Sequence, residues 1–303
     1  MTIPATPDAH LMVGTRLARD ILIRSAERAA ALVGRTGRRP CLATVLVGDD
    51  PASATYVRMK RNRCHEAGID SRYVHLPAGT GTAELVTRIA DLSADPAVHG
   101  ILLQHPVPGH IDERAAFEAI APAKDVDGVT THSFGTMAFG LPGFVSCTPG
   151  GIVRLLDAYG VDPRGRHAVV IGRSPILGRP VGMLLLARDA TVTYCHSRTT
   201  DLPAIVGGAD LVVAAVGRPN FVQGTWLKPG AVVVDAGYHP GGVGDVDFDA
   251  ARAVAGMLTP VPGGVGPMTI AILLEQTVRA AEEQLGGAAA DPLAAGRPRQ
   301  PDQ

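Results

Sequence analysis

Short apolar runs alternate with amphipathic segments along most of the chain. Apolar positions within residues 17–33 recur at the spacing of a helix, whereas residues 41–47 form an apolar run of strand length. The first half is predicted to form helices over residues 17–33, 51–67 and 82–92, and strands over residues 41–47, 73–76 and 100–104. This alternation favours a mainly parallel sheet covered by helices.

The second half repeats the alternation after a glycine- and proline-rich stretch at residues 140–151, which marks the predicted domain boundary. Helices are expected over residues 151–159, 178–188 and 268–285, and strands over residues 168–171, 190–194, 211–216 and 231–235. We therefore predict two α/β domains, residues 1–147 and 148–267, and place the helix 268–285 on the first domain because its apolar side needs cover. Residues 286–303 are rich in small residues and proline, which predicts a disordered tail.

Composition narrows the class of protein. The chain has 303 residues, 46% of them hydrophobic, which suits two ordinary domains and excludes a disordered chain. A net charge of −1 argues against a nucleic-acid partner, and no apolar stretch has the length of a membrane span. The four cysteines lie far apart without CxxC spacing, so we expect no metal site. Reduced cysteines and an N-terminus without a signal peptide favour the cytoplasm.

Residues 167–186 show the order strand, glycine turn, helix, which typically places backbone N–H groups beneath a phosphate. Gly172, Ser174 and Gly178 lie in the predicted turn, and Gly182 would let the helix approach the sheet. The spacing is not GxGxxG, so an ordinary glycine-rich turn is the alternative. The segment is nevertheless a candidate Rossmann-like nucleotide site.

The following strand favours NADP over NAD. It ends in the sequence CHSRT at residues 195–199, without the acidic residue that NAD-binding folds place after this strand. Arg173, Ser197 and Arg198 would instead form a cationic pocket, and arginine binds phosphate through its planar fork. The alternative is that both arginines are solvated surface charges.

A second group of candidate residues lies in the first half. Ser53, Tyr56 and Lys60 are spaced i, i+3 and i+7, so they share one face of a predicted helix. Gln104 ends a predicted strand, where open α/β sheets hold ligands, and Asp125 lies in the KDVDG loop. Taken alone, each residue could have an ordinary structural role: the lysine as a solvated charge, the tyrosine in the core and the aspartate as a capping carboxylate. Together they favour an active site.

These residues lie in stretches that make the chain resemble the bifunctional methylenetetrahydrofolate dehydrogenase/methenyltetrahydrofolate cyclohydrolase (FolD) family. The stretches span residues 47–269 in the family's order. They are VGDDPASATYVRMKRNRCHEAGI, GILLQHPVPG, PAKDVDGV, CTPGG, VVIGRSPILGRPVGMLLL, ATVTYCHSRT, ADLVVAAVGRP and LTPVPGGVGPMT. The joint presence of the YxxxK, KDVDG and PGGVGPMT elements makes the match specific.

The resemblance implies a role for each candidate residue of the first half. Lys60 is expected to be catalytic, with Gln104 hydrogen-bonded to it and Tyr56 packed against the folate ring system. The first aspartate of KDVDG, Asp125, is expected to bind the pterin N–H groups, and Ser53 to contact the substrate. Burial and neighbouring cationic charge would lower the pKa of the lysine towards neutrality.

For the rest of the chain, the resemblance implies an active-site cleft between the folate-binding domain and the NADP-binding domain. Pro262 and Gly263 would shape this cleft beside the substrate, and Gly217 would join the cofactor site. The implied activity is oxidation of 5,10-methylenetetrahydrofolate with NADP, followed by hydrolysis to 10-formyltetrahydrofolate. A homodimer acting on tetrahydrofolate derivatives, in one-carbon metabolism and purine biosynthesis, is also implied.

Several residues depart from the family pattern. These are His105, Val129, Ser133, Ser146 and Pro175, the last of which removes a backbone donor from the glycine turn. These substitutions allow an altered substrate fit or cofactor affinity, as in a family member that has diverged to serve a specialised pathway. One alternative is therefore a dehydrogenase for a related one-carbon or pterin substrate, favoured by His105 and Ser133, which are expected in the pocket. Another is a nucleotide-sensing protein without catalysis, against which the joint presence of the catalytic residues argues.

Overall fold

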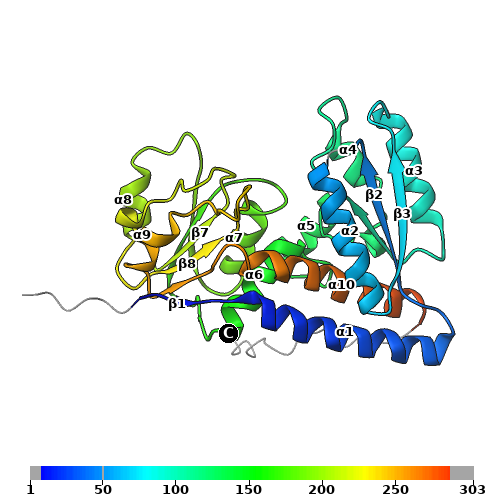
Figure 1. Cartoon of the computed structure of the whole chain (residues 1–303), viewed down its shortest axis with the longest axis horizontal. Helices are drawn as coiled ribbons and strands as arrows, with labels where there is room; N and C mark the ends of the chain where they lie inside the picture. The colour runs from blue at the N-terminus through cyan, green and yellow to red at the C-terminus, as the bar shows by residue number, and fades with distance from the viewer. Residues whose placement is uncertain (1–7, 50, 287–303) are drawn as a thin grey trace, which may run out of the picture.

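The computed structural model describes residues 8–49 and 51–286, except for the side chains of residues 51–57. The predicted tail, apart from Gly286, lies outside these residues. No helix within them has both the length and the apolar character needed to cross a membrane. The described chain forms two halves, each built on its own parallel sheet (Figure 1).

The first half holds a three-stranded parallel sheet in the order β3-β2-β4. Its strands are β2 (Cys41–Val47), β3 (Asp70–Leu76) and β4 (Gly100–Leu103). Helices α3 (Thr82–Ala94) and α4 (Glu113–Glu118) cover one face, where Ile89 and Phe117 share a core with Val45. Helix α2 (Pro51–Glu66) lies on the other face, where Cys64 shares a core with Leu42. Alternating strand residues therefore enter two different cores.

The second half holds a six-stranded parallel sheet in the order β1-β9-β8-β7-β5-β6. Its strands are β1 (His10–Leu11), β5 (His167–Ile171), β6 (Thr191–Cys195), β7 (Leu211–Ala214), β8 (Val232–Asp235) and β9 (Met257–Leu258). Helices α6 (Cys147–Ala158) and α7 (Gly178–Leu186) cover one face, and α8 (Leu202–Gly207) and α9 (Phe248–Arg252) the other. This is a Rossmann-like arrangement, and the predicted α/β class is confirmed.

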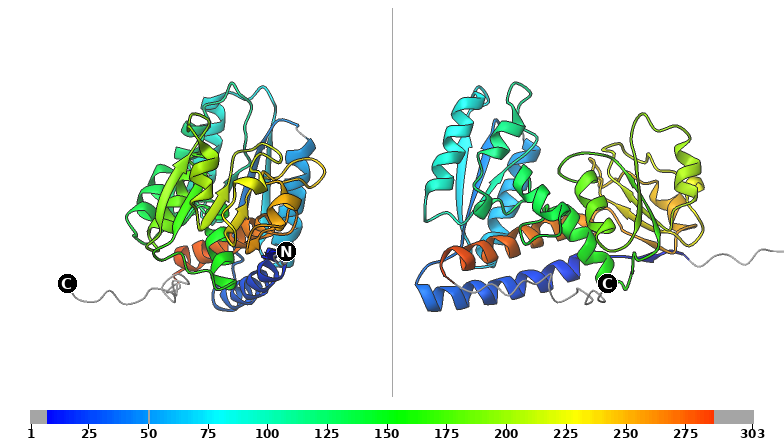
Figure 2. Two further views of the ribbon diagram at one scale, coloured as in Figure 1. Left: turned by 90° about the vertical axis from the view of Figure 1, so that its left-hand side faces the viewer. Right: turned by 180° about the vertical axis from the view of Figure 1, so that it is seen from behind.

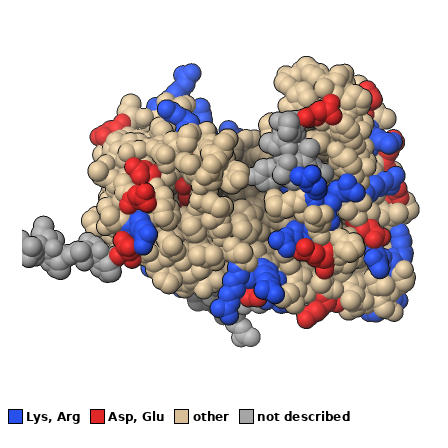
Figure 3. All heavy atoms as spheres, in the orientation of Figure 1, with Lys and Arg blue, Asp and Glu red and all other residues tan. Residues whose placement is uncertain are grey.

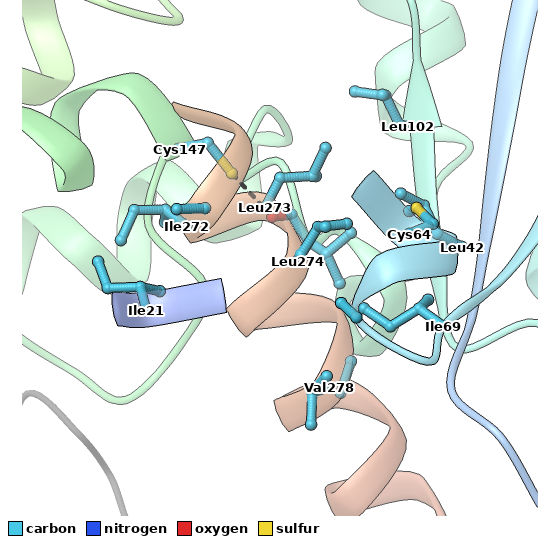
Figure 4. Close-up of a cluster of buried hydrophobic side chains, with 14 of the residues drawn as sticks. Ile21, Leu42, Cys64, Ile69, Leu102, Cys147, Ile272, Leu273, Leu274 and Val278 are labelled. Carbon is cyan, nitrogen blue, oxygen red and sulfur yellow. Dashed lines mark hydrogen bonds between the residues drawn. The ribbon is translucent and has the colours of Figure 1, made fainter. Parts of the chain in front are cut away.

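Two long helices, α1 (Gly14–Thr36) and α10 (Val265–Gln284), run side by side beneath the first half (Figures 1 and 2). Helix α10 lies in the core of that half, where Leu274 and Val278 share a cluster with Ile21 of α1 and Leu102 of β4 (Figure 4). The prediction that the C-terminal helix packs back on the first domain is confirmed. It begins three residues earlier than expected, at Val265, which is already buried.

The N-terminal strand departs from the predicted division of the chain. His10 and Leu11 pair with Met257 and Leu258, so the described chain begins in the second sheet and then crosses to the first half as α1. A strand of two residues has no alternation that a sequence pattern could show. The boundary between residues 147 and 148 stays a prediction, although α6 already begins at Cys147.

The glycines of the expected linker have a packing role. A Cβ on Gly151, within α6, would lie 2.9 Å from the Met268 Cβ of α10, so the small residue lets two helices approach closely.

The short helices were not predicted, because a segment of a few residues carries no clear period. They are α4, α5 (Thr131–Ala138), α8, α9 and the 3-10 turns η1 (Pro122–Lys124) and η2 (Gly224–Trp226). Acidic and basic side chains are interspersed on the face drawn in Figure 3.

Candidate active site

A cavity of about 1460 Å³ lies between the two halves, and both halves contribute to its walls. The space-filling view shows the molecule hollowed between its two halves (Figure 3). On the side of the first half, the lining includes Lys60, Gln104 and Asp127. On the other side it includes Asp235 and the segment 260–267. The expected cleft between two α/β domains is therefore present.

Lys60 and Gln104 are hydrogen-bonded to each other at the wall of this cleft. The Lys60 Nζ donates to Gln104 Oε1 at 3.0 Å, and Gln104 Nε2 donates to the carbonyl oxygen of His105 at 3.0 Å. The Gln104 backbone N–H donates to Val45 O at 2.8 Å, which places the side chain at the end of β4. With its amide nitrogen bound to a carbonyl, Gln104 presents its oxygen to the lysine, as the resemblance implied.

The Lys60 side chain has a lowered pKa. Burial is the main cause, because it disfavours the charged ammonium, while Asp127 and the cysteines Cys147 and Cys64 act in the opposite direction and raise the pKa. The expectation that burial lowers this pKa is confirmed. The neighbouring charge is the anionic carboxylate of Asp127, however, and not the cationic group that we expected.

The two aspartates of KDVDG occupy different environments, which corrects the expectation for Asp125. Its side chain is fully buried, and it does not line the cleft. Oδ1 accepts from Val129 N at 3.1 Å, and Oδ2 accepts from Thr130 N at 2.9 Å and Ser133 Oγ at 2.6 Å. Asp127 lines the cleft instead. A sequence pattern could not separate the two, since both flank the same valine in one short loop.

Cys147 is a further cleft residue that sequence analysis did not single out. Its thiol is buried and lies 3.2 Å from the carbonyl oxygen of Val126, to which it donates. Burial raises the pKa of this thiol well above its ordinary value, and the negative charge of Asp127 raises it further. The thiol therefore stays protonated and is a poor nucleophile. Among the described residues, no group of three or more His, Cys, Asp and Glu side chains is placed to hold a metal ion.

The remaining substrate candidates fall into two groups. The backbone of α2 places Ser53 two turns and Tyr56 one turn before Lys60, but their side chains lie outside the described residues. Pro262 and Gly263 line the cleft, as expected for residues that shape it. Gly263 has a φ of 105°, a conformation that favours glycine, and its carbonyl accepts from Gly14 N at 2.8 Å.

The glycine turn after β5 is held by close backbone contacts. Gly172 has a φ of 130°, and a Cβ there would lie 2.2 Å from the carbonyl oxygen of Ala215. A Cβ on Gly178 would lie 2.4 Å from the Gly172 oxygen. The Ser174 Oγ accepts from Leu177 N at 3.1 Å and from Gly178 N at 3.4 Å, just before and at the first residue of α7. Glycine is thus required at two of the predicted cofactor positions.

Arg173, Ser197 and Arg198 project from the ends of adjacent strands. Ile171 of β5 pairs with Cys195 of β6, so Arg173 and Ser197 each lie two residues beyond paired positions. All three side chains are exposed, and within the described residues neither guanidinium makes a hydrogen bond or an ion pair. No carboxylate immediately follows β6. Two available guanidinium groups beside a hydroxyl fit the 2′-phosphate of NADP better than the 2′-hydroxyl of NAD.

The departures from the family pattern have separate structural roles. The Ser133 hydroxyl donates to Asp125, and Ser146 Oγ donates to the Gly128 carbonyl at 2.8 Å, so both support the KDVDG loop from outside the cleft. The expectation that Ser133 lines the pocket is therefore wrong. His105 does line the cleft, with its ring edge-on to Phe117 at a centroid distance of 6.0 Å.

Comparisons with known proteins agree with this geometry. The catalytic-domain profile of the tetrahydrofolate dehydrogenase/cyclohydrolase family matches residues 12–127, and the family's NAD(P)-binding-domain profile matches residues 146–285. "Bifunctional protein FolD 1" from Streptomyces avermitilis is 71% identical over 93% of this chain and 98% of its own length.

Two solved structures match nearly the whole chain. A bifunctional FolD methylenetetrahydrofolate dehydrogenase/cyclohydrolase from Campylobacter jejuni superposes with a TM-score of 0.88 at 43% identity, covering 91% of this chain and 99% of the other. The FolD enzyme of Trypanosoma brucei, solved with NADP cofactor and inhibitor, gives a TM-score of 0.88 at 38% identity, covering 93% of this chain and 100% of the other.

Proposed function

The chain belongs to the tetrahydrofolate dehydrogenase/cyclohydrolase family, and from this we infer that it oxidises 5,10-methylenetetrahydrofolate with NADP and hydrolyses the product to 10-formyltetrahydrofolate. The observation that carries this inference is the placement of the Lys60–Gln104 pair in a cleft whose opposite wall is the Rossmann-like half. One cleft can then serve both reactions of one-carbon folate metabolism.

In the oxidation, this chain's residues bind and orient the reactants. NADP, when bound, accepts a hydride from the one-carbon bridge of the folate. Arg173, Ser197 and Arg198 would hold its 2′-phosphate, and the Gly172 turn, together with Gly178 and Gly217, would let the backbone approach it closely. Positioning is the main requirement for hydride transfer, because no side chain needs to carry electrons.

In the hydrolysis, Lys60 would handle protons. Water adds to the bridge carbon of the methenyl cation, one carbon–nitrogen bond breaks, and one proton is released in the net reaction. A lysine with a lowered pKa has a larger neutral fraction, so its Nζ can accept the proton from the attacking water and return it to the departing nitrogen. Gln104 holds that amine in place through an uncharged contact.

We assign the pterin contact to Asp127 and not to Asp125. A carboxylate in the cleft can accept from several pterin N–H groups at once, whereas both Asp125 oxygens are bound within their own loop. Ser53 and Tyr56 remain proposed substrate contacts on the basis of family resemblance. The homodimer, the cytoplasmic location, the domain boundary and a role in purine biosynthesis are likewise proposals that rest on family membership.

The test is a spectroscopic assay of the purified protein with 5,10-methylenetetrahydrofolate and either NADP or NAD. NADPH formation and methenyl absorbance are followed together. We expect NADPH to appear without accumulation of the methenyl compound, and NADP to support faster turnover than NAD. Reduction of neither cofactor would refute the proposed function. Turnover only with another pterin would favour the related-substrate alternative, for which His105 in the cleft is the motivating feature.

A further inference from the structure

Asp245 is a fully buried aspartate that plays no part in the proposed chemistry. Its Oδ2 accepts from Val216 N at 2.6 Å and Gly217 N at 2.9 Å, and its Oδ1 accepts from Arg218 N at 3.0 Å. Three successive backbone N–H groups form the kind of concavity that binds anions in proteins. Here the concavity is filled by a carboxylate of the chain itself.

The fourth partner of this carboxylate is His239. Its Nε2 lies 2.8 Å from Asp245 Oδ1, and the side chain is 19% exposed. An ionised carboxylate only accepts hydrogen bonds, so Nε2 carries the proton of this contact. The backbone of His239 is also fixed, since its N–H donates to the carbonyl of Val243 at 2.8 Å in a short antiparallel bridge.

The His239–Asp245 pair joins the cofactor edge of the sheet to the wall of the cleft. The loop that Asp245 binds, residues 216–218, directly follows Ala215, whose N–H donates to Ile171 at 2.8 Å and whose carbonyl touches Gly172. On the other side, Tyr238 precedes His239 in sequence and lines the cleft. Asp235 ties the two parts together, because its Oδ1 accepts from the backbone N–H of Asp245 at 2.9 Å.

We propose that His239 is a positioning residue for NADP. By binding Asp245 it holds the Gly217 loop against the Gly172 turn, so that the cofactor meets a preformed surface and needs to order less of the chain on binding. The proposal rests on the proposed function, because it assumes that NADP binds at this edge. The proton-handling pair is independent of it, since Lys60 donates to Gln104 and Gln104 donates to the carbonyl of His105.

The experiment measures the Kd of NADP by calorimetry in the full-length protein and in four variants. His239→Ala and the larger His239→Phe both remove the donor, whereas His239→Gln keeps an N–H of similar reach. His167→Ala is the matched control, since that ring makes two hydrogen bonds at the opposite end of the same sheet, to Gly208 O and Thr193 Oγ1. Cyclohydrolase activity is assayed on methenyltetrahydrofolate without NADP, and Tm is recorded for each protein.

We expect the Kd to rise about tenfold in His239→Ala and His239→Phe, and to stay within about twofold of wild type in His239→Gln and the control. Cyclohydrolase activity should be unchanged in all four variants. An unchanged Kd in the folded Ala or Phe variant would overturn the proposal, as would equal losses of NADP affinity and cyclohydrolase activity. Absence of both activities from the wild-type enzyme would instead refute the proposed function.

Discussion

The two aspartates of the KDVDG loop give the sharpest test of the site. Asp127→Asn and Asp125→Asn make the same chemical change at positions two residues apart, so each serves as the control for the other. Asp125 is fully buried and bonded to two backbone N–H groups and a hydroxyl, whereas Asp127 faces the cleft. We therefore expect Asp125→Asn to lose stability and Asp127→Asn to lose substrate binding.

The magnitudes follow from these contacts. In Asp125→Asn an amide N–H₂ replaces one acceptor, so at least one buried donor loses its partner, at a cost of about 2–3 kcal/mol. For a chain of this size that lowers Tm by about 3–5 °C. In Asp127→Asn the buried partner affected is the thiol of Cys147, which is only a weak donor, so Tm should stay within about 2 °C of wild type. Its weakened contact with the pterin should raise the folate Kd about 30-fold.

Asp127→Asn should also change the pH dependence of hydrolysis. Burial lowers the pKa of Lys60 and the charge of Asp127 partly offsets this, so removing that charge lowers the pKa further. Because the neutral amine forms as pH rises through its pKa, activity should rise with pH, and this rise should move to lower pH in the variant. The assay follows methenyl absorbance against pH, corrected for the rate without enzyme. Weaker folate binding in Asp125→Asn at unchanged Tm, with normal binding in Asp127→Asn, would refute the reasoning.

Three further variants test other parts of the structure. Lys60→Met should lower cyclohydrolase activity about 10²–10⁴-fold while folate still binds, and normal loss of methenyl absorbance would contradict the catalytic assignment. Arg173→Ala should raise the KM for NADP about 10–100-fold and leave the KM for NAD nearly unchanged, as measured by NAD(P)H absorbance. Gly182→Ala places a Cβ 2.2 Å from the Tyr194 hydroxyl oxygen and should cost about 1–3 kcal/mol in a denaturant titration; wild-type stability would mean that the tyrosine moves freely.

Much of the fold could be predicted because its strands are buried and its helices are amphipathic. Runs such as residues 41–47 and 168–171 are strand-length and apolar, as expected for parallel strands covered on both faces. The final helix could be placed because its apolar side needs cover. The two-residue strand at His10–Leu11 could not, because its pairing with Met257–Leu258 depends on a contact between opposite ends of the chain.

The site was predicted less completely, for reasons of geometry. Lys60 and Gln104 could be singled out because a helix face and a strand end leave a pattern in the sequence, and the family resemblance implied their contact. The choice between Asp125 and Asp127 depends on the direction of side chains in an irregular loop. Such a loop leaves no periodic pattern in the sequence. Asp245 shows a different difficulty, because its role comes from backbone N–H groups that any residue carries.

The exchange of chain ends between the two halves has a consequence for how the protein is made. The first half takes core residues from α10, and the second sheet takes its edge strand from His10–Leu11. During synthesis on a ribosome, the first sheet is finished long before residues 265–284, which complete its core, have emerged. Domains usually fold in order from the N-terminus, but here the first half is not complete until the last helix arrives. We therefore expect the first half to finish folding only after the second half has been synthesised.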